Sequence, residues 1–362
     1  MNRGIRIAAV SLFSLVTLQI AKSDDETHEP ILPELTTAPQ RIVSTVPTNG
    51  DVNPYGVAYV PNGFPEKGGS LEPGDVLVSN FNNGGNLQGT GTTIVKISST
   101  GTMSVFFRGN KGLGLTTALG VLKRGFVLVG NLPTSDGTSA TVQQGSLIIL
   151  NNAGAIVGNL TDASLLDGPW DLAIHDQGSR SQVFVSNVLS GTVTRLDLSI
   201  RDSLVTVSSK TQIASGYMHR ADPNALVIGP TGLAYDADHD ILYVASTGDN
   251  TVFAIEHARA ASKDAGVGRI VYTDSTHLHG PLGLALAPNG NLITANGDAV
   301  NPGGTQNALV EFTTSGHFVA QSQVDPGMAG GAFGLGFGRL KNEISFAAVD
   351  DVQNTLKIWT VH

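Results

Sequence analysis

The segment "GPLGLALAPNGNLITAN" (residues 280–296) has two close relatives earlier in the same chain. These are "GPTGLAYDADHDILYVAS", which begins at Gly229, and "GPWDLAIHDQGSRSQVFVSN", which begins at Gly168. In every copy a Gly-Pro pair precedes a short apolar run, and a turn then leads into a second run of β-forming residues. Such self-similarity within one chain indicates a repeat architecture, and it outweighs any local prediction of secondary structure.

The repeated phrase can be followed along the whole chain as six anchor positions. Successive anchors are 64, 51, 61, 51 and 51 residues apart. A glycine lies two residues after each anchor, except in the third copy, where that position is Asp171, and an apolar residue follows every time. The anchors are Pro54, Ala118, Pro169, Pro230, Pro281 and Ala332. A period of roughly 50 residues is typical of propellers and other arrays of one supersecondary unit.

Each unit contains four short apolar or alternating runs, separated by turns rich in glycine, asparagine and aspartate. Four such runs predict a four-stranded antiparallel meander. The last unit stops at its third run, "TLKIWTV" (residues 355–361), whereas "QRIVSTV" (residues 40–46) precedes the first anchor as an unmatched strand. We therefore predict an all-β fold, a six-bladed β-propeller whose ring is closed by the N-terminal strand in the last blade. A β-solenoid and a pair of β-sandwiches are the alternatives, and neither predicts the missing and the unmatched strand.

Composition narrows the class of protein. The chain of 362 residues is 41% hydrophobic and 14% charged, which is enough apolar material for a large core and excludes general disorder. It contains no cysteine, so disulfides, thiol nucleophiles and thiolate metal sites are excluded. The net charge of −9 argues against nucleic acids and anionic membrane surfaces as partners. We expect the protein to be a monomer.

The first residues have the pattern of a secretory signal. Two arginines precede an uncharged run over residues 7–21, which is short for a membrane span, and small residues follow at the expected cleavage site. We interpret residues 1–23 as a signal peptide, residues 24–39 as a flexible lead-in and residues 40–362 as the propeller. The mature protein is then secreted or periplasmic and has no membrane span. An uncleaved membrane anchor is the alternative.

Over residues 40–362 the units resemble the NHL-repeat propellers and the related senescence-marker/gluconolactonase-type lactonases. The resemblance is carried by Pro230-Thr-Gly-Leu-Ala with Leu242-Tyr243-Val244, and by Pro281-Leu-Gly-Leu-Ala with Pro288-Asn-Gly-Asn. It implies the six-bladed fold but no single activity, because such scaffolds carry lactonases, lyases and binding modules.

The lactonases of this group imply a divalent metal, held by a glutamate in an early "E-G-P" motif, one or two asparagines, and an aspartate at a "Y-V-x-D" position. This chain has Asn53-Pro54-Tyr55 at the first place and Ser246 at the last, and no other copy supplies an acid there. Only the asparagines match, so Asp171 is the one obvious substitute for the missing acids. Calcium or another divalent metal is the cofactor that the resemblance implies.

Asp171 breaks the repeat, because the other five copies have glycine at its position. Next to Trp170 at the channel mouth, burial would raise the pKa of Asp171 toward that of a general acid or base. The same carboxylate suits a hard cation such as calcium. A structural alternative is a carboxylate that accepts hydrogen bonds from backbone amides of an adjacent blade.

Two rings of residues are expected at one end of the channel, where the innermost strands start and the second strands end. The first ring, one residue after each anchor, consists of Tyr55, Leu119, Trp170, Thr231, Leu282 and Phe333. It would either floor an apolar funnel or pack the rim of the channel. The second ring consists of Asn80, Asn131, Asn187, Ser246, Asn296 and Ala348. Its amides suit calcium or sugar-like hydroxyl groups, or else each asparagine caps its own turn.

His277 and His279 flank Leu278 just before the fifth anchor. An extended chain would point both imidazoles to one side, as a two-histidine contribution to a metal site with Asp171 and Asn187. Solvated loop histidines are the alternative.

Long loops follow the second strands of the first, second and fifth units, and they are rich in Asn, Gln, Gly, Ser and Thr. They would wall the channel opening with neutral hydrogen-bonding groups, which favours a small polar ligand or a protein surface as the partner. We therefore predict a ligand-binding propeller, with metal-assisted hydrolysis of a lactone or ester as its enzymatic form. A non-catalytic, extracytoplasmic interaction scaffold is the alternative.

Overall fold

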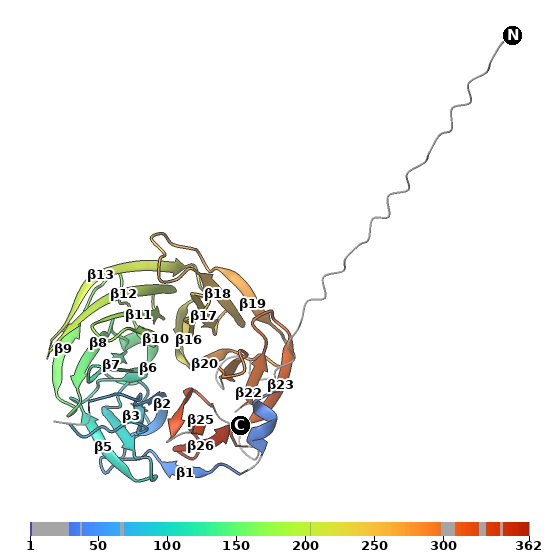
Figure 1. The fold of residues 1–362 in the computed structure, drawn as a ribbon. Helices are drawn as coiled ribbons and strands as arrows, with labels where there is room; N and C mark the ends of the chain where they lie inside the picture. Colours follow the sequence, from blue (N-terminus) through green and yellow to red (C-terminus); the bar gives the residue numbers. More distant parts are fainter. Residues whose placement is uncertain are drawn as a thin grey trace.

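In the computed structural model six four-stranded antiparallel sheets are arranged in a ring around a central channel (Figure 1). The structure describes residue 1 and residues 29–36, 38–65, 69–202, 204–297, 308–325, 331–340 and 343–361. The predicted all-β, six-bladed propeller is therefore confirmed. Within each blade, consecutive strands pair in chain order from the channel outward, as expected for a meander.

The blades have the following strands. The first contains β2 (Val52–Tyr59), β3 (Val76–Asn82), β4 (Thr93–Ile97) and β5 (Met103–Arg108). The second contains β6 (Leu115–Leu122), β7 (Phe126–Asn131), β8 (Ser146–Asn151) and β9 (Ile156–Leu160). The third contains β10 (Pro169–Asp176), β11 (Arg180–Asn187), β12 (Thr192–Arg201) and β13 (Leu204–Ser215). The fourth contains β16 (Pro230–Asp236), β17 (Ile241–Ser246), β18 (Thr251–Glu256) and β19 (Arg269–Thr273).

The fifth blade contains β20 (Pro281–Leu286), β21 (Leu292–Asn296), β22 (Ala308–Phe312) and β23 (Phe318–Gln323). The sixth contains β24 (Leu335–Leu340), β25 (Glu343–Asp350), β26 (Thr355–Val361) and, as its outermost strand, β1 (Arg41–Ser44). Outside the blades lie a small hairpin of β14 (Arg220–Asp222) and β15 (Leu226–Ile228), and two 3-10 helices, η1 (Leu32–Thr36) and η2 (Ser139–Thr141).

The ring is closed by the first strand of the propeller. β1 pairs antiparallel with β26, with Arg41 opposite Ile358 and Ser44 opposite Thr355. Figure 1 shows β1 beside β26 at the edge of the sixth blade. The unmatched strand and the missing strand inferred from the repeats are thus one pair, which confirms the predicted closure.

The core is divided among the seams between the blades. The buried hydrophobic residues of the described chain form six clusters, one at each seam between neighbouring sheets. The second strands are buried on both faces, and all seven residues of β3 are buried. Their continuous apolar runs in the sequence follow from this position between two neighbouring blades. Burial of apolar surface across the seams therefore holds the sheets face to face.

Glycine recurs on the inner strands because neighbouring blades touch there through their backbones. A Cβ atom on Gly232 would collide with the carbonyl oxygen of Leu282, and one on Gly283 with that of Phe333. A side chain at these positions would push the inner strands apart. The glycine two residues after the anchor is thus a close-approach residue.

Strand pairing corrects the sequence alignment in two blades. In the first blade Pro54 pairs with Asn80, and Val57 pairs with Val78. In the second blade the residues that make the equivalent pairs, with Asn131 and Val129, are Leu115, rather than Ala118, and Leu119. Between these two pairings the inner strand holds one extra residue, so this copy has no glycine at the close-approach position. In the sixth blade the second strand ends at Asp350, which lies opposite Thr355, and not at Ala348.

Part of the segment that we expected to be a flexible lead-in is packed against the propeller. Ile31 and Leu32 are buried in the cluster between the fifth and sixth blades. Their amide N–H groups donate to the two carboxylate oxygens of Glu311, at 3.1 and 2.9 Å. The side-chain amides of Asn289 and Asn291 donate to the same carboxylate, at 2.9 and 2.8 Å. The sequence pattern of residues 24–39 predicted none of this, because Glu311 lies 280 residues from Ile31.

Of the expected signal peptide, only residue 1 lies within the described residues. None of the helices in the described part of the chain has the length and apolar character that crossing a membrane requires.

The closure can be tested with two prolines on adjacent residues of β1. The N–H of Thr45 donates to the carbonyl of Asn354, so by alternation the N–H of Val43 also faces β26, whereas that of Ile42 faces outward. We expect Val43→Pro to lower the free energy of unfolding by roughly 3 kcal/mol, because it removes a ladder hydrogen bond and disturbs a packed position. Urea denaturation followed by circular dichroism measures the loss.

The matched control is Ile42→Pro, since Ile42 is exposed and its N–H lies on the free edge of the sheet. Its unfolding midpoint should stay close to that of the wild type. Equal midpoints for the two variants would contradict the role of β1 in closing the ring.

Candidate functional site

The two rings expected at the channel mouth lie at the same end of the propeller. Pro54 pairs with Asn80, Pro169 with Asn187 and Pro281 with Asn296, so each inner strand begins where the second strand of its blade ends. The loops that follow the second strands therefore rise around the start of the inner strands. This end of the channel is the candidate functional site.

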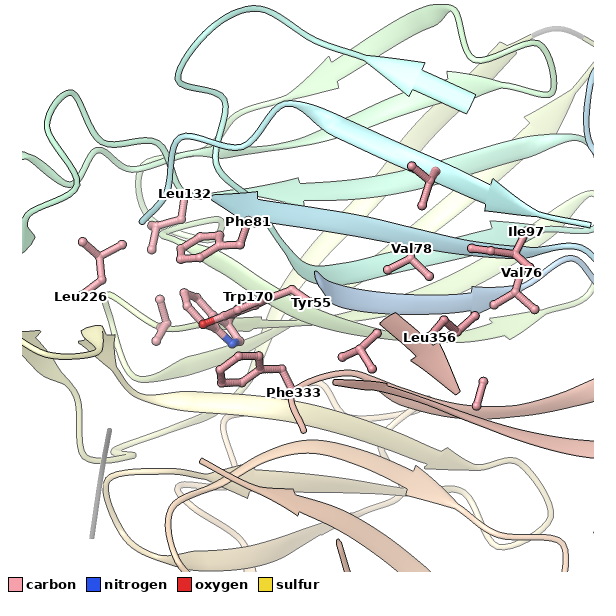
Figure 2. Packing of buried hydrophobic residues seen from close by; sticks show 14 of the residues in the cluster. Tyr55, Val76, Val78, Phe81, Ile97, Leu132, Trp170, Leu226, Phe333 and Leu356 are labelled. Atoms are coloured by element: carbon pink, nitrogen blue, oxygen red, sulfur yellow. The ribbon is translucent and has the colours of Figure 1, made fainter. Parts of the chain in front are cut away.

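An aromatic cluster forms the floor of the site. Figure 2 shows Tyr55, Phe81, Trp170 and Phe333 packed against one another, with Leu226 beside them. The ring of Tyr55 stacks on Phe81 and Phe333, with centroid separations of 4.6 and 4.4 Å, and Trp170 meets the rings of Tyr55 and Phe81 edge-on. These side chains come from the first, third and sixth blades. The predicted apolar floor is present, and it joins distant blades by mutual packing.

Above this floor lies a pocket of about 550 Å³. Its wall is made by loops of the first and sixth blades and by the β14–β15 hairpin. Six of the residues that line it carry side-chain amides, and Asp351 is the only charged residue among the described ones: Asn53, Asn82, Asn86, Gln88, Asn224 and Asn354 supply the amides. The long loop of the first blade thus walls the pocket with neutral groups, as predicted. Most of the corresponding loop of the fifth blade, residues 298–307, lies outside the described residues.

Three polar atoms of pocket-lining residues are buried and have no hydrogen-bond partner among the described residues. They are Oδ1 of Asn53, Oδ1 of Asn82 and Nε1 of Trp170. Buried polar atoms in native proteins are nearly always satisfied, so each such atom calls for a partner. These three atoms are closed off from the cavity, so a ligand with several hydroxyl groups would instead meet the side-chain amides of the pocket wall.

The hairpin in the pocket wall carries a strained residue. Leu226 has a φ of +64°, and the N–H of Val227 donates to the carbonyl of Ala225 at 2.7 Å, which makes a γ-turn around Leu226. This turn type is rare and strained for a non-glycine residue. The side chain of Leu226 is buried in the cluster with Trp170, and this packing offsets the strain. The hairpin is therefore fixed to the aromatic floor.

Asp171 lies one residue beyond Trp170, but it is not among the residues that line the pocket. Its Oδ1 accepts the N–H of Leu172 at 2.8 Å, and its Oδ2 accepts the N–H of Leu233, on the next blade, at 3.0 Å. These are the contacts of the structural alternative. Burial raises the pKa of Asp171 to about 8, although both amide hydrogen bonds oppose the shift. The catalytic role of Asp171 stays a prediction.

The four asparagines are buried in contacts with the chain and not grouped around the pocket. Asn80, Asn131, Asn187 and Asn296 donate through Nδ2 to backbone carbonyls of the segments that lead into their own blades. Asn296 also accepts the N–H of His279, and Asn187 that of Asp167. Each asparagine therefore links the second strand of its blade to the segment that precedes the inner strand. The alternative prediction, in which each asparagine caps the turn that follows it, does not describe these contacts.

The residues predicted to hold a metal are not brought together. Nδ1 of His277 contacts Oδ2 of Asp274, and the imidazole stacks on Phe318. Nε2 of His279 lies 3.2 Å from the carbonyl oxygen of Thr276. Both oxygens of Asp171 already accept backbone hydrogen bonds, Oδ1 within the third blade and Oδ2 from the fourth. Among the described residues no group of three or more His, Asp or Glu side chains is placed to hold a metal ion.

Two features of the site were not predicted. Asp350 occupies the second-strand end in the sixth blade, so an acid does stand there, but it is buried in an ion pair with Lys357 at 2.9 Å. The β14–β15 hairpin is the second feature, and the run "ADPNA" (residues 221–225) carries the Asp-Pro-Asn signal of its turn. That turn signal was sufficient to predict a hairpin, but not its position over the channel.

Comparison with solved structures finds the same fold in several proteins. A gluconolactonase from Xanthomonas campestris has a TM-score of 0.55 and 14% identity, with 91% of this chain and 92% of that chain covered. Regucalcin from Agrobacterium tumefaciens, titled a calcium-binding protein, has a TM-score of 0.52 and 14% identity, covering 88% and 94%. A chain of the nidogen/laminin complex has a TM-score of 0.52 and 10% identity, covering 80% and 87%.

No family model and no curated protein matches the chain. At these identities the comparisons show a shared six-bladed architecture, in agreement with the resemblance inferred from the repeats.

The raised pKa of Asp171 predicts a pH-dependent stability. Between pH 4 and 8 the folded state retains a proton that the unfolded state has released, so the stabilising effect is full below about pH 4 and is lost as the pH rises toward 8. The free energy of unfolding of the wild type, minus that of Asp171→Asn, should fall across this window by at most about 1.4 kcal/mol per pH unit. Urea titrations at a series of pH values measure the difference. A flat or rising difference would show that the carboxyl group has an ordinary or lowered pKa.

Proposed function

We propose that this propeller binds a small, neutral, polyhydroxylated molecule, of the class of sugars and their lactones, in the pocket at the channel mouth. The observation that carries the proposal is the set of six side-chain amide residues around a cavity with an aromatic floor. A cavity of this size, apolar at its base and with a few converging polar groups, is the usual form of a small-molecule site.

Aromatic and amide side chains of the pocket would contact different parts of the ligand. The rings of Tyr55, Trp170 and Phe333 would cover the apolar face of a sugar ring, while the wall amides would donate to and accept from its hydroxyl groups. Because Asp351 is the one charged residue among the described lining residues, an ionic ligand would lack charge complementarity. A neutral ligand is therefore favoured over a carboxylate or a phosphate at this end of the channel.

Hydrolysis of a lactone is the second candidate, and the similarity of fold to a gluconolactonase favours it. The residues present do not fit the divalent metal that such chemistry would use, because no three acidic or histidine side chains of the described chain converge. Asp351 is the one carboxylate on the pocket wall among the described residues. The geometry therefore supports the binding of a ligand, and we propose no hydrolytic step.

Export is part of the proposal, and it rests on the signal-like pattern of residues 1–23. The mature protein would then meet its ligand outside the cytoplasm.

The proposal is tested by titrating the Trp359→Phe protein, in which Trp170 is the remaining tryptophan, with glucose and with gluconolactone. We expect a saturable change in tryptophan fluorescence, since Trp170 forms the floor of the pocket. Ala225→Phe should weaken binding about tenfold or more, because Ala225 lines the pocket and a benzyl group there would occupy ligand space.

Ala221→Phe is the matched control, since Ala221 is exposed on the same hairpin and does not line the pocket. It should bind like the parent protein. Acid release from the lactone, followed with a pH indicator, separates the two candidates: binding without release supports the binding function, and release above the spontaneous rate supports hydrolysis. If neither sugar nor lactone changes the fluorescence, the proposal is wrong and an interaction scaffold becomes the better reading.

A further inference from the structure

A second cavity, of about 670 Å³, lies between the third and fourth blades. It is lined by the end of β10, the start of β11, the end of β12 and the loop after β18, so it lies at the end of the blades opposite the channel-mouth pocket. Hydrogen bonds join the two blades beside this cavity. Nη1 of Arg195 donates to the carbonyls of Ala258, Arg259 and Ala261, and the side chain of Gln182 donates to the carbonyl of Arg259.

Register places a polar stripe on the face of the third blade that borders this cavity. Arg180 lies opposite Ser199, and Gln182 lies opposite Asp197. Arg201 follows Ser199 by two residues and therefore shares its face of the sheet. Arg180 and Arg201 are diagonal neighbours across two strands, close enough for their long side chains to reach one group.

The cavity carries uncompensated positive charge. Arg180 and Arg201 are exposed, and the guanidinium group of neither makes a hydrogen bond or ion pair with a described residue. Arg259, in contrast, forms an ion pair with Asp240, with 3.3 Å between Nε and Oδ1, although this Nε atom makes no hydrogen bond to a described group. Arginine side chains that converge without acidic partners are the usual means of binding a tetrahedral oxyanion.

The two acids on the lining are already engaged. Asp197 accepts from Gln182 and Ser209 and pairs with Arg195 at 3.3 Å, and this last arginine adds a further positive charge behind the cavity wall. Asp240 accepts from the hydroxyl of Tyr235 and from the backbone N–H of Arg259, at 3.0 and 2.9 Å. Four arginines and two aspartates thus leave the site net positive, in a chain whose net charge is −9.

His175 supplies a further unsatisfied group on the lining. Its Nε2 atom is buried and has no partner among the described residues. Burial, and then the nearby charge of Arg259, lower the pKa of His175, so the imidazole is neutral at pH 7. It therefore adds no positive charge to the site.

We propose that the cavity between the third and fourth blades is a binding site for a small molecule that carries a phosphate or sulfate group. Arg180 and Arg201 would hold the oxyanion, with Arg259 and the hydroxyl of Ser199 as additional donors. The site is independent of the channel-mouth pocket and of the ligand proposed there. Its volume exceeds that of an oxyanion alone, so a phosphate or sulfate ester of a small hydrophilic molecule is the ligand class.

The test is calorimetric titration of the full-length protein with inorganic phosphate, inorganic sulfate and glucose 6-phosphate at low ionic strength. We expect saturable binding that weakens as salt is added, with the ester bound more tightly than the free ions if the rest of the cavity contributes. Arg180→Gln and Arg201→Gln should each weaken binding about tenfold, the loss expected for one charge-assisted contact. Both residues are exposed, so the variants should fold.

Arg124→Gln is the matched control. Arg124 is exposed in the turn between β6 and β7, on the same end of the propeller but outside the cavity, and it makes no hydrogen bond or ion pair with a described residue. It removes the same charge from the same face and should change affinity by less than about twofold. Equal weakening by all three variants would reduce the effect to general electrostatics, and the absence of saturable binding to wild type would also overturn the proposal.

Discussion

The pairing of β1 with β26 is the interaction on which the remaining structure depends. A ring of sheets that is not closed leaves one open seam, and the two apolar faces that meet between the first and sixth blades would then be exposed. Closure also determines the geometry of the channel mouth, because it places the inner strands of all blades around one axis. The aromatic floor exists only under this condition, since Tyr55, Trp170 and Phe333 come from three blades and meet in one cluster.

The repeats were sufficient to predict the number of blades, their strands and the closing pair, because each of these follows from a periodic pattern. Deviations within one copy were not predictable in the same way. The extra residue before Leu119 and the shift from Ala348 to Asp350 change register without changing the apolar pattern. The docking of Ile31 on Glu311 joins positions that no local pattern relates. The aromatic residues of the floor occupy equivalent positions of the repeat, so the periodic pattern places them at one end of the channel. The roles of the asparagines depend on individual hydrogen bonds, which the pattern does not predict.

The seam between the third and fourth blades differs from the other seams. At its inner end Asp171 replaces the close-approach glycine and joins the two inner strands through amide hydrogen bonds. At its other end the apolar filling gives way to arginines and serines around a cavity. The long connection from the third blade to the fourth also folds into the hairpin that walls the channel mouth. The departures from the repeat are thus concentrated in one sector of the ring.

Closure by β1 has a consequence for the order in which the molecule can form. Arg41 and Ile358 are 317 positions apart, so β1 leaves the ribosome long before its partner strand β26 has been made. Blades one to five are each continuous in the chain and can collapse as they emerge, but the sixth sheet must wait for the carboxyl-terminal strand. During that interval β1 is an unpaired edge. Its short length and the arginine at its start limit mispairing with other chains until β26 has been made.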